Sequence, residues 1–67
     1  MDTASFDNHK AQVALTRDEI LIVNNALNEV CNALDAIEFS TRMGLDIENV
    51  QALLKQFGDL YDRMASR

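Results

Sequence analysis

The stretch LDAIEFSTRMGLDIENV, residues 34–50, decides the fold because it holds two helix starts with a turn between them. Asp35 and Asp46 each follow a leucine, and each has Glu or Asn three residues later and an apolar residue after that. This order is typical of a helix N-terminus, where the Asp side chain accepts a backbone N–H and the two apolar residues pack over the first turn. Gly44 adopts the left-handed conformation at little steric cost and therefore ends helices. The stretch predicts a short helix over residues 36–43, a turn and a further helix from residue 47.

The same pattern occurs upstream, in LTRDEI at residues 15–20. There Thr16 and Glu19 form a full capping box, in which each side chain accepts the backbone N–H of the other residue. We expect a first long helix over residues 17–34 and a last helix over residues 47–65. Gly58 lies inside the last helix and costs about 1 kcal/mol relative to alanine. The last helix is either continuous there or interrupted, and we favour the continuous one.

Apolar residues recur in both long segments at alternating intervals of three and four, and the first series continues to Ile37. This spacing forms an apolar stripe on each helix and suits shallow left-handed packing. Further apolar residues widen the stripe beyond what one antiparallel neighbour covers. We therefore predict an all-α chain, a helical hairpin of two long helices joined by a short helix, which assembles as a dimeric four-helix bundle. The predicted oligomer interface consists of Ile20, Val23, Leu27, Val30, Leu34, Val50, Leu53, Leu54, Phe57, Leu60, Tyr61 and Met64.

Residues 1–14 mix small and polar types without a sustained period, so we expect a flexible N-terminal arm tethered by Phe6 and Val13, followed by one helical domain over residues 15–67. A chain of 67 residues has room for only a thin core. Its single cysteine and single histidine build neither a disulfide framework nor a clustered zinc site within one chain. The lone cysteine fits a reducing cytoplasm. No apolar run approaches the roughly 18 to 20 residues that span a bilayer, so we expect no membrane contact.

Residues 36–54 resemble the helix-turn-helix motif, with Phe39 and Met43 apolar on the first helix, Ser40 small at the crossing and Gly44 at the turn. In DNA-binding members of that class, the second helix enters the major groove and nearby basic residues hold phosphates. Here that helix carries several acids, and the formal net charge of −5 repels phosphate backbones. Nucleic acid is therefore a disfavoured partner.

Three asparagines recur at intervals of four on the first long helix, although Asn is a mediocre helix former. Their amides both donate and accept hydrogen bonds, so they form either a partner-binding ladder or a solvated polar face. The predicted partner-binding residues are Asn24, Asn28, Asn32, Asp46, Glu48, Asn49 and Gln51.

Catalytic arrangements do not emerge from the sequence. Asp18 and Glu19 are adjacent and diverge by about 100° on a helix, no Ser or Cys has an evident base, and two glycines make no phosphate-binding loop. We expect no enzymatic activity, no cofactor and no metal. The leading interpretation is a small acidic interaction or regulatory protein of the cytoplasm, which acts as a homo-oligomer and binds or neutralises a basic protein. The alternatives are a helix-turn-helix transcriptional regulator and a purely structural oligomer.

Overall fold

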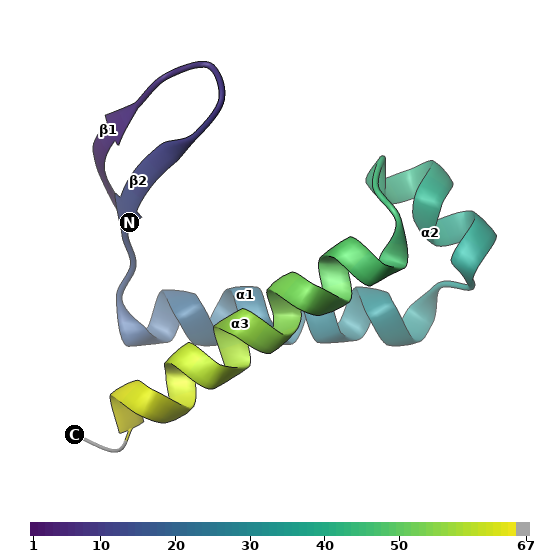
Figure 1. Cartoon of the computed structure of the whole chain (residues 1–67). Helices are drawn as coiled ribbons and strands as arrows, with labels where there is room; N and C mark the ends of the chain where they lie inside the picture. Colours follow the sequence, from purple (N-terminus) through teal and green to yellow (C-terminus); the bar gives the residue numbers. More distant parts are fainter. Residues whose placement is uncertain (66–67) are drawn as a thin grey trace.

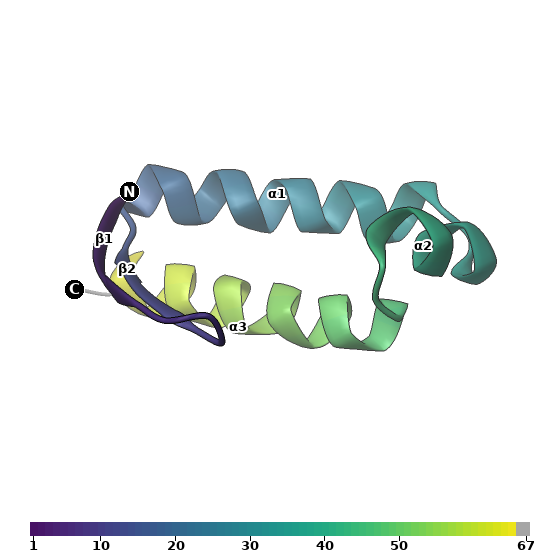
Figure 2. The same cartoon turned by 90° about the horizontal axis from the view of Figure 1, so that it is seen from above.

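The computed structural model describes residues 1–65, except for the side chain of Ala36. Its elements follow the chain in the order β1 (Asp2–Phe6), β2 (Ala11–Ala14), α1 (Arg17–Ala33), α2 (Ala36–Met43) and α3 (Ile47–Ala65). The two long helices α1 and α3 run antiparallel, and α2 connects them at one end (Figure 1). The strands form a β-hairpin at the other end of the helix pair, where α1 begins (Figure 2).

The start of α1 has the predicted capping box. The backbone N–H of Glu19 donates to Thr16 Oγ1 at 3.2 Å, and the backbone N–H of Thr16 donates to Glu19 Oε1 at 2.9 Å. Leu15 is half-buried and Ile20 is buried on either side of this turn. Local hydrogen bonding therefore begins α1 at Arg17, as the sequence predicts.

The connection through α2 also follows from local chemistry. Asp35 Oδ1 accepts the backbone N–H of Glu38 at 2.8 Å and so caps the start of α2. Gly44 ends α2 in the left-handed conformation, with φ of 74°. Asp46 accepts a long bond of 3.4 Å from Ser40 Oγ, which joins the last turns of α2 to the start of α3. These contacts reverse the chain direction and place α3 against α1.

The last helix is continuous through Gly58, as predicted. At this point the helices approach closely, because a Cβ placed on Gly58 would lie 3.5 Å from Asn24 Oδ1 on α1. The guanidinium of Arg17 also lies over the ring of Tyr61, 4.5 Å from its centroid. These two contacts identify one flank of the α1–α3 pair.

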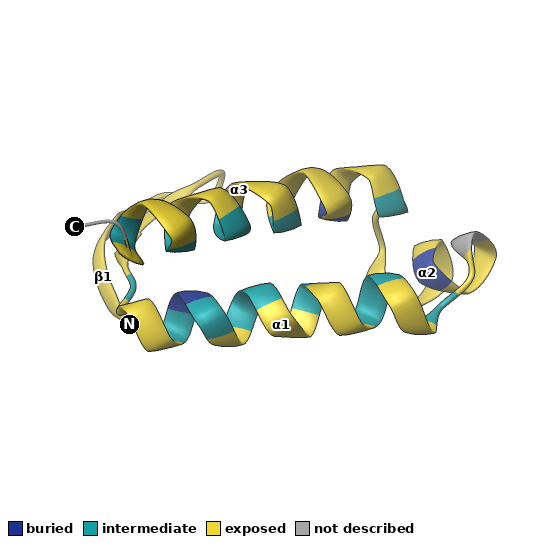
Figure 3. Ribbon diagram, turned by 90° about the horizontal axis from the view of Figure 1, so that it is seen from below, coloured by how far each residue is buried: buried dark blue, intermediate teal, exposed yellow. Residues whose placement is uncertain are grey.

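The core of the described residues is small. Ile20, Phe39 and Val50 are buried, and the remaining stripe residues between α1 and α3 are only half-buried or exposed (Figure 3). Ile37 is 82% exposed and does not continue the stripe of α1, because that helix ends at Ala33 and α2 begins anew after Asp35. Within residues 1–65, no helix is long and apolar enough to cross a membrane.

The prediction of an all-α chain is wrong, because residues 2–14 form an antiparallel hairpin instead of an irregular arm. Asp2 pairs with Ala14, Thr3 with Val13, Ser5 with Gln12 and Phe6 with Ala11. The pairing skips Ala4, which forms a bulge. Phe6 and Val13 are exposed, so they do not tether this segment to the helices.

Candidate interaction surfaces

The molecule exposes far more surface than a compact protein of its size. Its accessible surface is 5421 Å², whereas a compact monomer of 7.5 kDa exposes about 4,200 Å². Its radius of gyration is 13.4 Å, against about 11 Å for a compact chain of this length. The excess of about 1,200 Å² exceeds the roughly 800 Å² that each partner buries in a standard protein interface. The protomer therefore leaves apolar surfaces in water that a more compact chain would cover.

One such surface runs along a flank of the two long helices. On α1, Glu19, Val23 and Val30 lie on the same side, because they are spaced at i, i+4 and i+11. This side differs from the side of Arg17 and Asn24, which contacts Tyr61 and Gly58 of α3. On α3, Leu53 and Leu60 lie opposite the Gly58 side, and both are more than a third exposed. We call Val23, Val30, Leu53 and Leu60 the apolar flank.

The opposite flank is polar. Asn24 is half-buried beside Gly58, whereas Asn28 and Asn32 are exposed. Lys55 Nζ donates to Asp59 Oδ2 at 3.1 Å on the outer side of α3. The predicted asparagine ladder therefore has one member in contact with α3 and two that face solvent.

The hairpin is amphipathic because of its bulge. Side chains alternate along a strand and paired residues share a face, so Ala11 and Val13 share one face with their partners Phe6 and Thr3. Without the unpaired Ala4, Thr3 and Phe6 would lie on opposite faces, since they are three residues apart. We call Thr3, Phe6, Ala11 and Val13 the apolar hairpin face. Phe6 on this face is 79% exposed.

The other hairpin face is polar and internally hydrogen-bonded. Ser5 Oγ donates to Gln12 Oε1 at 3.1 Å across the strands. In the turn, Asp7 Oδ1 accepts the backbone N–H groups of His9 at 2.7 Å and of Lys10 at 2.9 Å. The bond from Lys10, and after it the bond from His9, lowers the pKa of the Asp7 carboxyl. This turn chemistry fixes the hairpin tip and leaves the side chains of His9 and Lys10 exposed.

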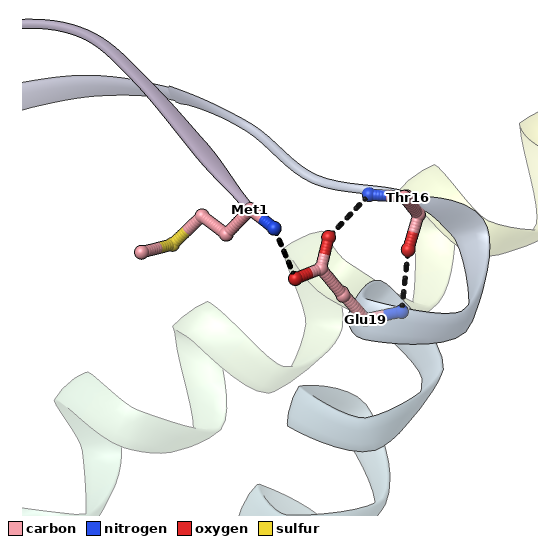
Figure 4. A network of polar contacts seen from close by, with 3 residues as sticks. All are labelled: Met1, Thr16 and Glu19. Atoms are coloured by element: carbon pink, nitrogen blue, oxygen red, sulfur yellow. Dashed lines mark hydrogen bonds and ion pairs between the residues drawn. The ribbon is translucent and has the colours of Figure 1, made fainter.

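An ion pair joins the hairpin to the helices. The N-terminal amine of Met1 donates to Glu19 Oε2, while Glu19 Oε1 accepts the backbone N–H of Thr16 (Figure 4). The amine, and after it the Thr16 N–H, lowers the pKa of the Glu19 carboxyl. One glutamate therefore serves both the α1 cap and the attachment of β1. Because Glu19 lies on the Val23 side of α1, the hairpin is attached on the side of the apolar flank.

A third apolar surface lies at the α2 end. Ile37, Met43 and Leu45 are all exposed there, although Phe39 of the same helix is fully buried. Leu45 is 59% exposed, so it does not pack with Val50 over the first turn of α3 as the sequence predicts. We call Ile37, Met43 and Leu45 the α2 patch. Four acids surround it in the sequence, Asp35, Glu38, Asp46 and Glu48, with Arg42 as the nearby base.

The structure divides the predicted oligomer residues into two groups. Ile20 and Val50 are buried within the protomer, and most of the others are half-buried between α1 and α3. Leu53 and Leu60 keep substantial exposure. The predicted partner-binding residues at the start of α3, which are Asp46, Glu48, Asn49 and Gln51, are all exposed.

Residues of the kinds that bind metal ions are dispersed over residues 1–65. No group of three or more His, Cys, Asp or Glu side chains there is arranged to hold a metal ion. Cys31 is half-buried on α1, and His9 lies at the hairpin tip.

The apolar hairpin face is the feature that the sequence interpretation missed. An Asp-Asn pair at residues 7–8, between short segments that contain Phe6 and Val13, is a weak hairpin signal. The bulge at Ala4 hides that signal, because it breaks the alternation of the first strand. Comparison of the chain with protein-family models, with curated proteins and with solved structures finds no match.

Proposed function

We propose that this protein is a small acidic, non-catalytic interaction module that acts as a homodimer. The observation that supports this most strongly is the excess accessible surface of about 1,200 Å² over a compact monomer. Covering a Phe, Ile or Leu side chain contributes roughly 1.5 to 3 kcal/mol, which is large beside the total stability of about 5 to 15 kcal/mol of a native protein. Self-association covers this surface without any other molecule.

Sedimentation at micromolar concentration tests the dimer. The expected species has about twice the protomer mass of 7.5 kDa. Dilution is expected to shift the distribution toward the protomer. A single species of protomer mass over the whole concentration range would contradict the proposal.

The proposal includes a basic protein as the second partner. Eleven acids against six bases give the chain its formal charge of −5, and complementary charge speeds and orients protein association. Glu48, Asn49 and Gln51 at the exposed start of α3 are the proposed contact residues. The single, half-buried thiol of Cys31 is compatible with a reducing cytoplasm as the site of action.

Capture from native lysate tests this second part. The tagged protein is expected to retain a basic protein at low salt and to release it at higher salt, because exposed charges are screened. Glu48→Gln is expected to weaken capture, whereas the matched change Glu29→Gln on α1 is not. Self-association with no captured protein would instead favour a purely structural oligomer.

Fluorescence anisotropy with labelled duplex DNA at low salt tests the helix-turn-helix alternative. We expect only weak binding that does not saturate, because the chain lacks the basic residues needed to neutralise several phosphates. Tight and saturable binding would contradict the proposal and favour a transcriptional regulator.

A further inference from the structure

The two most exposed apolar surfaces of this protein lie at opposite ends of the same side. Phe6 on the apolar hairpin face is 79% exposed, and Ile37 in the α2 patch is 82% exposed. In Figure 1 the hairpin and α2 rise on the same side of α1, and Figures 1 and 2 both place them at opposite ends of the long helices. They therefore do not cover each other within one protomer.

A dimer with a two-fold axis can cover both surfaces. If two copies face each other with their apolar flanks and run in opposite directions, the hairpin end of each copy meets the α2 end of the other. We propose that the apolar hairpin face of one protomer packs on the α2 patch of a second copy, so that each dimer contains two identical hairpin–α2 contacts. This inference rests on the homodimer proposed above and names its contact surface.

The distribution of exposed area favours this contact over one made by helices alone. The residues of the apolar flank are already partly covered, and Leu53 and Leu60 keep 43% and 37% of their exposure. An interface restricted to that flank leaves Phe6, Ile37 and Leu45 in water. A contact that includes the hairpin and α2 covers these three side chains as well.

Charge disfavours pairing of two α2 ends. The α2 end carries more acids than bases, with Asp35, Glu38, Asp46 and Glu48 against Arg42. The hairpin tip carries one acid, Asp7, and one base, Lys10, so it adds no net charge to a contact. Two α2 ends placed against each other would bring like charges together, whereas a hairpin placed on an α2 end avoids this repulsion.

Disulfide cross-linking between copies tests the contact. In a Cys31→Ser background, a protein with Phe6→Cys is mixed with a protein that carries Ile37→Cys and is oxidised gently. We expect a disulfide between the two different proteins, because cysteines bond when their Cα atoms lie within about 7 Å. As a matched control, Gln12→Cys on the polar hairpin face is expected to form little cross-link with Ile37→Cys.

The outcomes separate this inference from the proposed function. A sedimenting dimer without the Phe6–Ile37 cross-link would overturn the hairpin contact and leave the homodimer intact. A predominant cross-link between two Phe6→Cys chains would overturn it as well, in favour of hairpin–hairpin pairing. A protein that sediments only as a protomer would overturn both proposals.

A substitution in the apolar hairpin face gives a second readout. Phe6→Ser removes an exposed side chain, so the helical content of the protomer is expected to stay unchanged by circular dichroism. The dimer dissociation constant is expected to rise by about tenfold or more, as for aromatic anchors at other interfaces. Ser5→Ala, on the polar hairpin face, is the control and should leave the constant nearly unchanged. An unaltered constant for Phe6→Ser would contradict the contact.

Discussion

At the scale of single residues, Glu19 makes hydrogen bonds to two separate parts of the fold. Its carboxylate accepts the backbone N–H of Thr16 and the N-terminal amine, so the same group closes the α1 cap and holds the first strand. Its own backbone N–H is accepted in turn by the Thr16 hydroxyl. The start of the helical domain and the position of the hairpin therefore depend on two neighbouring side chains.

Replacing Thr16 by alanine tests the cap. Thr16→Ala is expected to lower the free energy of unfolding by about 1 kcal/mol, the usual cost of losing an N-cap hydroxyl. Thr41→Ala is the matched control, because the Thr41 hydroxyl donates to the Ile37 carbonyl within α2 and caps no helix start. Urea unfolding followed by circular dichroism measures both. Equal effects of the two changes would contradict the role of the cap.

The ionisation of Glu19 makes attachment of the hairpin sensitive to acid. Because its pKa is lowered in the folded protein, the contribution is complete above the ordinary glutamate pKa of about 4.3 and is lost as the pH falls through the lower folded value. The lowered pKa of Asp7 acts in the same direction at the hairpin turn. Amide exchange of residues 2–14 measured from pH 6 to pH 3 should show protection falling with acid. Glu19→Gln is expected to have weaker protection already at pH 6 and a smaller pH dependence; a dependence equal to that of the native chain would contradict this cause.

At the scale of elements, the two glycines perform opposite roles. Gly44 has positive φ and ends α2, whereas Gly58 lies inside α3 next to Asn24. The space at Gly58 accepts a methyl group at ordinary contact distance, 3.5 Å from Asn24 Oδ1. The backbone therefore requires glycine at the first position and not at the second.

Alanine substitutions should separate these roles by sign. Gly58→Ala is expected to raise the free energy of unfolding by about 0.5 to 1 kcal/mol, because alanine loses less backbone entropy in a helix. Gly44→Ala is expected to lower it by about 1 kcal/mol, because a side chain is strained in the left-handed region. Thermal or urea unfolding of both variants provides the comparison. Destabilisation by Gly58→Ala would show that the helices are packed more tightly there than the structure indicates.

The helices were predictable from the sequence because their determinants are local. Thr16 with Glu19 marks the start of α1, Asp35 with Glu38 marks the start of α2, and Gly44 marks its end. Each signal lies within three residues of the helix end that it marks. The hairpin was not predictable in the same way. Its strands are short and bury none of their residues, and the bulge at Ala4 removes the alternation that identifies a strand.

The surfaces of the candidate site were predictable only in part. The apolar spacing correctly indicates that α1 and α3 pack on each other. Ile20 is the buried residue of α1 in this contact, and Val50 is that of α3. The same spacing assigns Ile37 to the α1 stripe, although the break at Leu34–Asp35 turns it to solvent. Which apolar residues stay exposed depends on where one helix ends and the next changes direction. The spacing of apolar residues in the sequence does not indicate those changes of direction.

At the scale of the whole molecule, the protomer is a flat layer with extents of 37 × 32 × 15 Å. Three helices and a projecting hairpin enclose few side chains, and only Ile20, Phe39 and Val50 are buried among the residues described. Small domains of this size usually gain stability from disulfides, metals or oligomer contacts. The homodimer proposed above would cover the exposed apolar side chains and so add to the stability of the fold.

Thermal unfolding as a function of protein concentration tests that dependence most directly. A protomer stabilised by its own copy unfolds at a temperature that rises with total concentration, by mass action. We expect the midpoint of the native chain to rise over a concentration range from about 1 to 100 μM, across which a moderate dimer assembles, and the midpoint of Phe6→Ser to rise less. A midpoint that stays constant over this range, in a protein that sediments as a protomer, would contradict the account.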